Sequence, residues 1–144
     1  LTAGCYYLSG DDPGTPGKDE GWNPLWARYA QFSELYAYAF DAEKGAYWSN
    51  IVYPSLSASL DFDRLHTIGL SAGMLMAPEK NGPGGGNLRG YFFTACYDFP
   101  LFRNIIARRD VLYGHLLAEL LNPRDYYKVD DMAYFLRWEM SYRF

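Results

Sequence analysis

The chain has 144 residues, of which 49% are hydrophobic and 19% aromatic, and its formal net charge is −4. That length supports one domain at most, and the many aromatic residues exclude intrinsic disorder, a collagen-like chain and a disulfide framework. The longest stretch without charge or histidine, 45–60, contains Ser, Asn and Pro, which excludes a membrane-spanning helix. The 13 basic and 17 acidic residues form no basic stripe, so we expect no nucleic-acid partner.

The two cysteines, Cys5 and Cys96, lie in apolar runs and lack the spacing of a metal site. We therefore expect inert thiols, with no disulfide, metal or cofactor. The chain begins Leu-Thr-Ala, without Met and without a charged region followed by an apolar one. Any signal peptide is expected to have been removed or to lie outside this sequence.

The segment 2–8 alternates only weakly, but three later segments show a clear period of two. In 55–62 apolar residues alternate with serines and Asp61, and in 66–76 they alternate with small or polar residues. Three residues separate these two segments, which predicts a short hairpin turn. In 88–98, Tyr91 and Tyr97 lie near opposite ends of an apolar face, and Asp98 belongs to the other face. All four segments are predicted strands.

Segment 111–121 fits two structures. Its leucines at four-residue spacing would suit a helix that starts near Asp110, whereas a strand would place His115 and Glu119 on one face. We favour a strand, because the final segment needs an antiparallel partner in the surrounding meander.

The final segment, 132–144, alternates most strictly. Its even positions are all apolar, whereas its odd positions include Arg137, Glu139 and Arg143. A helix would place charges beside Trp138, so the period of two predicts a strand with one wholly apolar face.

The connections alternate in length, as in outer-membrane barrels, which have short periplasmic turns and longer outer loops. Short links follow residue 62 and, less clearly, occupy 100–110, while 78–87 and 122–131 are longer and glycine-rich or polar. By this pattern 9–52 is an outer loop of roughly forty residues that is long enough to fold inward. Within it, Asn23-Pro24 and the apolar residues that follow fit a capped amphipathic helix, although 34–40 could instead be a strand. Such a helix would either belong simply to the loop or form a constriction inside a pore.

Alternation alone also fits a soluble sandwich or a lipocalin-like barrel with its apolar side inside. Aromatic residues near the strand ends favour a membrane barrel, where aromatic girdles flank the lipid-facing band. The expected membrane-facing girdle residues are Tyr91, Tyr97, Trp138, Tyr142 and Phe144. The opposite face would line a water-filled lumen, and its expected pore-lining residues are Asp61, Asp98, His115, Glu119, Arg137, Glu139 and Arg143. The predicted fold is an all-β, antiparallel, up-and-down transmembrane β-barrel.

Several motifs carry a resemblance to known proteins. The ending Tyr142-Arg143-Phe144 resembles the C-terminal strand signature of bacterial outer-membrane proteins. The sequence around 9–13, 17–19 and 22–25, which begins Ser-Gly-Asp-Asp-Pro, resembles the Ser-Gly-Asp loop of the alginate-export family of outer-membrane barrels. Further segments that look like that family are 33–36, 47–50, 115–119 and 135–139.

This resemblance implies an eighteen-stranded barrel with a polar channel in the outer membrane of a Gram-negative bacterium. It also implies recognition of the C-terminal strand by the barrel assembly machinery. We count six strands, below the minimum of about eight for a closed membrane barrel. We therefore expect 1–144 to be the C-terminal portion of a larger barrel. Its partners would be outer-membrane lipid and a hydrophilic solute or a polysaccharide such as alginate.

Three chemical readings of the sequence are weaker. Asp11, Asp12, Asp19 and Glu20 lack the spacing of a known Ca²⁺ loop, so solvated loop acids are the preferred interpretation. The glycine-rich 82–86 lacks the Lys-Ser or Lys-Thr of a phosphate loop. His115, Glu119 and a serine from a neighbouring strand could imitate the nucleophile and base of a barrel esterase, yet no GxSxG motif supports this. We expect no catalytic residues.

The predicted function is therefore a non-enzymatic, porin-like channel for passive passage or export of a hydrophilic solute. A polyanion such as alginate would favour a basic channel, whereas the expected pore-lining set has two arginines and four acids. The alternative is a soluble β-barrel that binds a small apolar ligand inside. An outer-membrane barrel hydrolase ranks last.

Overall fold

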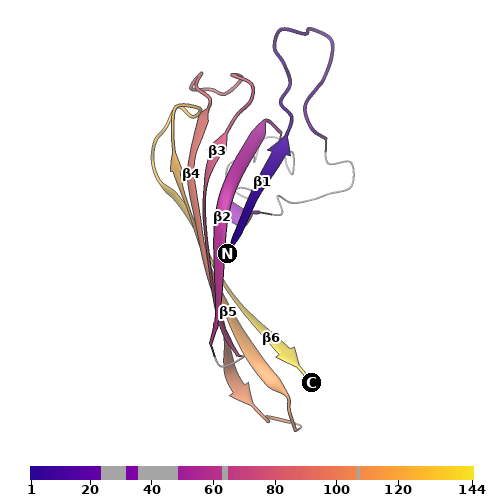
Figure 1. The fold of residues 1–144 in the computed structure, drawn as a ribbon, viewed down its shortest axis with the longest axis vertical. Coiled ribbons are helices and arrows are strands. Elements are labelled where there is room, and N and C mark those ends of the chain that lie inside the picture. Colours follow the sequence, from indigo (N-terminus) through magenta and orange to yellow (C-terminus); the bar gives the residue numbers. More distant parts are fainter. Residues whose placement is uncertain (24–31, 36–48, 63–64, 107) are drawn as a thin grey trace.

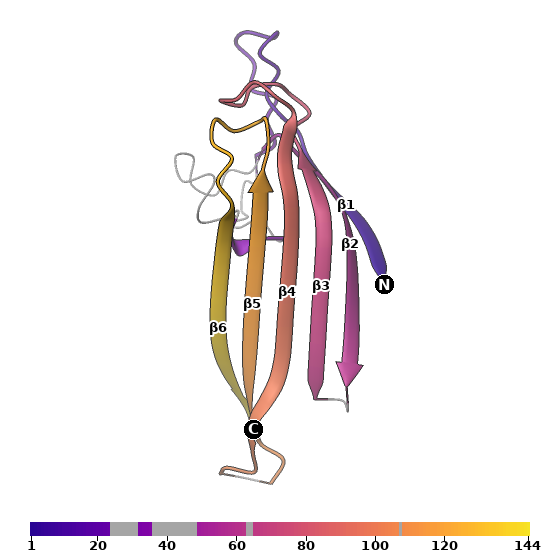
Figure 2. The same ribbon diagram turned by 90° about the vertical axis from the view of Figure 1, so that its left-hand side faces the viewer.

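The computed structural model describes residues 1–23, 32–35, 49–62, 65–106 and 108–144. Six strands in these residues form one antiparallel sheet (Figures 1 and 2). The strands are β1 (Thr2–Leu8), β2 (Ile51–Phe62), β3 (His66–Met76), β4 (Leu88–Arg103), β5 (Val111–Pro123) and β6 (Ala133–Arg143).

The strands pair in chain order, so each one lies beside its neighbours in sequence. This confirms the predicted all-β, antiparallel, up-and-down arrangement of six strands. The ambiguous segment 111–121 is a strand, and it pairs with the final segment from Val111 opposite Arg143 to Leu121 opposite Ala133. The sheet is open, with β1 and β6 at its two edges.

β4 differs most from its predicted bounds. The sequence suggested a strand over 88–98 followed by a connection over 100–110, whereas β4 continues to Arg103. The register shifts between Pro100 and Phe102, which marks a bulge or irregularity, and such a shift accommodates a proline that cannot donate a ladder hydrogen bond. Tyr97 therefore lies well inside the strand and not at its end, which corrects the placement of this girdle residue.

The connections alternate in length as predicted. Residues 63–65 and 104–110 are the short connections at one end of the sheet. The described residues 9–23 and 49–50 of the longest connection, together with 77–87 and 124–132, lie at the other end (Figure 2). The predicted helix after Asn23 and the alternative strand over 34–40 fall mostly on 24–31 and 36–48, outside the described residues.

The long connections are hydrogen-bonded to one another near the start of β2. The Asn50 side-chain amide donates to the Glu79 carbonyl oxygen at 2.8 Å and to Asn81 Oδ1 at 2.6 Å. Arg89 donates to the Ser49 carbonyl oxygen and to the Tyr126 hydroxyl, and its guanidinium lies 4.3 Å from the centre of the Tyr126 ring. These contacts hold the three connections as one group.

The sheet is a single curved layer with two different faces (Figure 1). Because side chains alternate along a strand, each strand contributes to both. We call one the open face, and it includes Leu56, Leu70, Phe93, Leu120 and Leu136. The other, which we call the loop face, includes Tyr53, Ser57, Thr94, Glu119 and Arg137. Residues 32–35 pack on the loop face.

The buried apolar cluster lies on the loop face, toward the end with the long connections. Its members are Leu35, Ile51, Tyr53, Leu75, Phe92 and Leu121. An added Cβ at Gly73 would lie 2.4 Å from the Tyr53 ring and 2.6 Å from the Pro54 carbonyl oxygen. A glycine at position 73 therefore leaves the space in which the Tyr53 ring lies across β3.

Candidate functional site

A row of polar side chains crosses the loop face of five strands. Strand register places Asp61, Thr67, Asp98, His115 and Glu139 directly opposite one another in turn, from β2 to β6. Thr67 Oγ1 donates to Asp61 Oδ1 at 2.7 Å, and His115 Nδ1 lies 2.8 Å from Asp98 Oδ1. A sequence with period two brings these residues to one face, and the register aligns them in one row.

Glu119 lies four residues further along β5, two rows away on the same face, and anchors residues 32–35, which we call the docked segment. Its Oε2 atom accepts hydrogen bonds from the Ser33 hydroxyl at 3.1 Å, from the Glu34 amide at 2.9 Å and from the Leu35 amide at 2.6 Å. The Glu119 side chain is 4% exposed. Three donors around one oxygen stabilise a buried carboxylate, because charge-assisted hydrogen bonds replace the lost water.

A second contact links the docked segment to β6. Arg137 forms an ion pair with Glu34, and its Nη2 atom lies 3.6 Å from Glu139 Oε2. Arg143, near the other end of β6, lies over the Tyr113 ring at 4.9 Å. The positive charge of Arg137 is thus shared between two carboxylates.

Aromatic rings hold the same segment from the other side. The Phe32 ring centre lies 5.4 Å from that of Tyr6, 4.9 Å from that of Tyr53 and 6.4 Å from that of Phe92. Such distances are typical of favourable aromatic pairs. Residues 32–35 therefore contact the loop face through both polar and aromatic groups, from β1 to β6.

The structure brings the expected polar set together on the loop face. Asp61, Asp98, His115 and Glu139 share the row described above, Arg137 and Glu119 lie in the next two rows, and Arg143 lies beyond Tyr113. Glu119 differs from the expected exposed wall residue because residues 33–35 cover it. Sequence reasoning missed Phe32, Ser33 and Thr67 as parts of the site.

Four of the five expected girdle residues lie on the open face, and the fifth, Phe144, follows the last strand. Tyr91 is toward the long connections, Tyr97 and Trp138 share a row with Leu116, and Tyr142 pairs with Leu112 near the short turns. The Tyr142 hydroxyl donates to Asp110. Phe144 follows β6, and its ring centre lies 5.8 Å from that of Tyr142.

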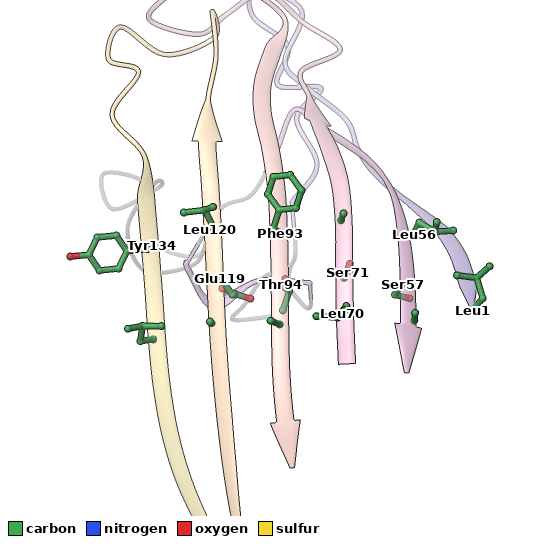
Figure 3. Close-up of a pocket in the computed structure, with 15 residues that line it drawn as sticks. Leu1, Leu56, Ser57, Leu70, Ser71, Phe93, Thr94, Glu119, Leu120 and Tyr134 are labelled. Carbon is green, nitrogen blue, oxygen red and sulfur yellow. The ribbon is translucent and has the colours of Figure 1, made fainter. Parts of the chain in front are cut away.

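The open face is hollowed near its middle by a groove of about 580 Å³. One row across it combines Leu136, Ala118, Ala95, Leu70 and Ala58, so alanines leave space between the leucines. Figure 3 shows side chains from strands β2 to β6, and Leu1 beside β1, arranged along this groove. Many of these leucine and aromatic side chains are exposed, Leu70 at 56% and Leu136 at 71%.

The esterase hypothesis finds no assembled nucleophile and base in the described residues. Ser33 donates to Glu119, and the ring of His115 contacts Asp98 instead of a serine.

The loop acids bond to nearby chain groups. Asp12 accepts from the Gly14 amide, Asp11 from the Glu20 amide and Asp19 from the Gly21 amide. Such bonds are typical of side chains that fix turns. Among the described residues, no group of three or more His, Cys, Asp or Glu side chains is placed to hold a metal ion. The described part of the chain also contains no helix long and apolar enough to cross a membrane.

Cys5 and Cys96 are free thiols on opposite faces of the sheet. Cys5 pairs with Pro54 on the open face, and Cys96 pairs with Leu117 on the loop face. No family model, curated protein or solved structure matches this chain.

Proposed function

We propose that this sheet is part of the wall of an outer-membrane β-barrel channel, with its open face toward lipid and its loop face toward a water-filled lumen. The observation that carries the proposal is the open face itself. Leucine, phenylalanine, tyrosine and tryptophan side chains stay exposed across the strands of one layer. A continuous apolar surface of this kind indicates contact with lipid or with another apolar partner.

The dimensions of the open face support a membrane location. Five strands have 11 to 16 residues, and a transmembrane strand needs about 9–11. Tyr91 pairs with Asn122 and Tyr142 pairs with Leu112, ten residues earlier on β5. At about 3.3 Å per residue these levels are about 33 Å apart along the strand. A tilt of about 45° reduces this to about 23 Å, close to the apolar band of about 25 Å in outer-membrane barrels.

The loop face supports a polar lumen. It carries the row from Asp61 to Glu139, and it holds an inward-folded segment of the long connection through Glu119 and Arg137. Outer-membrane barrels use such inward loops to narrow a channel. Further strands would pair with the edges of β1 and β6, because an unpaired edge is unfavourable in lipid.

The proposed activity is passive passage or export of a hydrophilic solute. The polysaccharide part of this proposal, with alginate as the example, rests on the sequence resemblance to the alginate-export-like family. Negative charges on the wall, such as Asp61 and Asp98, would tune the selectivity for ions and charged sugars. Assembly through the C-terminal strand by the barrel machinery belongs to the same proposal.

The test is single-channel conductance of the reconstituted protein in planar bilayers, with and without oligouronates. We expect stable steps, and block by the sugar would support the polysaccharide part. Asp61→Lys should shift the ratio of cation to anion permeability, whereas Asp130→Lys, the same charge change at the exposed loop end, should shift it much less. A folded product that stays soluble and does not insert would overturn the proposal.

That last outcome would support the alternative, a soluble β-protein that binds an apolar ligand. The groove between Leu70 and Leu136 is the observation in its favour. The polar row and the docked segment lie on the opposite face, which supports the membrane proposal over this one.

A further inference from the structure

The last residue of β4 and the connection to β5, residues 103–110, form a turn that projects beyond the ends of β2 and β3 (Figure 2). It lies at the end opposite the long connections. Phe102, the residue before it, pairs with Leu112 on the open face, next to Tyr142. The turn is therefore continuous with the short-turn end of the apolar surface.

Asp110 accepts hydrogen bonds from backbone amides in the described part of this turn. Its Oδ1 atom accepts from the Ile105 amide at 2.8 Å and its Oδ2 atom accepts from the Ile106 amide at 2.7 Å. The Asn104 amide donates to the Asp110 carbonyl oxygen at 3.0 Å, and Asn104 Oδ1 accepts from the Arg109 amide at 2.9 Å. Asp110 is 1% exposed. The amides of Asn104, Ile105, Ile106 and Arg109 are therefore hydrogen-bonded within the turn.

The exposed side chains in the described part of this turn include basic and apolar ones. Arg103, Arg108 and Arg109 are exposed, and so are Ile105 and Ile106, the latter at 82%. None of these five side chains is buried, and the side chains that bond to the backbone of the turn are those of Asn104 and Asp110. Three positive charges with two adjacent isoleucines form a surface that fits an anionic, partly apolar partner.

We propose that this turn, 103–110, contacts the surface of a phospholipid bilayer and binds anionic headgroups. The guanidinium groups would pair with lipid phosphates, for which arginine geometry is well suited. The isoleucines would enter the interfacial layer next to Phe102 and Tyr142. This inference rests on the proposed membrane location and adds the chemistry of the lipid partner at this end of the sheet.

The opposite end of the sheet, where the long connections lie, provides the contrast. The connection that follows β1 carries Asp11, Asp12, Asp19 and Glu20, all exposed, with Lys18 as its basic residue in the described part. A surface with this charge repels anionic headgroups. The preference for anionic lipid is thus expected at the short-turn end only.

The experiment compares binding of the full chain to neutral phosphatidylcholine vesicles and to vesicles with about one third phosphatidylglycerol, at low and high salt. The test variant combines Arg103→Gln, Arg108→Gln and Arg109→Asn, since asparagine tolerates the positive φ of 81° at position 109. The matched control combines Lys18→Gln, Lys80→Gln and Lys128→Gln, three exposed lysines in the long connections. Both variants change the net charge equally.

We expect the unmodified chain to bind anionic vesicles more tightly, and the preference to weaken at high salt. The arginine variant should lose about tenfold or more of this preference, while the lysine control keeps it. Equal binding to both vesicle types by the unmodified chain, or equal loss in both variants, would overturn the inference and leave the membrane proposal intact. Failure to bind either vesicle type would overturn both.

A second variant separates the apolar part of the contact. Ile105→Ser with Ile106→Ser should lower the affinity for both vesicle types and leave the preference for anionic lipid unchanged. Unchanged affinity for both types would contradict the proposed entry of the isoleucines into the interface.

Discussion

The two faces of this sheet are made by alternate residues of the same strands, yet they follow different rules. On the open face, Leu70, Leu136 and Trp138 stay exposed, at 56%, 71% and 58%. On the loop face, Glu119 and Phe92 are buried, although one is charged and the other apolar. Water-soluble sheets bury their apolar face, and the proposed contact with lipid would account for the exposure of this one.

The difference between the two faces means that residues adjacent in the sequence lie in different environments. Ala95 and Cys96 are adjacent in β4 but lie on opposite faces. A period of two is therefore sufficient to assign each residue to a face, and it leaves open which face meets water. The docked segment, with aromatic contacts at Phe32 and a polar contact at Ser33, covers part of the loop face only.

The largest expected effect comes from a charge in the middle of the open face. Leu70→Arg should lower the free energy of unfolding in a lipid bilayer by about 2–4 kcal/mol, the cost of arginine near the midplane of a barrel surface. Urea unfolding of the reconstituted protein measures this. The matched control is Ser59→Arg, on the exposed part of the loop face, which should change stability little. Similar losses for both variants would show that the two faces have the same surroundings.

The next effect concerns the anchor of the docked segment. Glu119→Ala removes the acceptor of three hydrogen bonds, so the segment should be held less tightly by about 1–3 kcal/mol. Amide hydrogen exchange at Glu34 and Leu35 should become correspondingly faster. Glu139→Ala, at an exposed carboxylate in the polar row, should leave these amides protected. Unchanged exchange in the Glu119 variant would mean that the aromatic contacts alone hold the segment.

The smallest effect tests a polar contact on the open face. His66 Nδ1 lies 2.7 Å from the Tyr97 hydroxyl, so Tyr97→Phe should cost about 0.5–1.5 kcal/mol of unfolding free energy. Tyr91→Phe is the control, because Tyr91 contacts Arg124 through its aromatic ring and phenylalanine keeps that ring. Equal small losses of unfolding free energy in both variants would show that the hydrogen bond between Tyr97 and His66 does not stabilise the fold.

Much of the fold follows from the sequence because side-chain alternation is local. The strand over 132–144 follows from its own alternation, whereas the pattern of 111–121 fits two structures and the strand is favoured there because the final segment needs an antiparallel partner. The bounds of β4 were wrong because Pro100 reads as a strand end. The bulge beside it lets the pairing continue to Arg103, and no short pattern predicts that.

The candidate site was predicted only in part. Alternation places Asp98, His115 and Glu139 on one face, but their alignment in one row depends on register, which comes from pairing between strands. The burial of Glu119 by Ser33 joins residues 86 positions apart. Contacts at such separation leave no periodic signal, so sequence reasoning treated Glu119 as an open wall residue.

The most direct test of the central claim is the reactivity of thiols on the two faces of β4 in a bilayer. One protein carries Cys5→Ser and keeps Cys96, and the other carries Cys5→Ser, Ala95→Cys and Cys96→Ser. A small water-soluble maleimide should label Cys96 on the loop face and leave the thiol at position 95 protected by lipid. Rapid labelling at position 95 in the reconstituted protein, at the rate seen in denaturant, would contradict a lipid-facing open face.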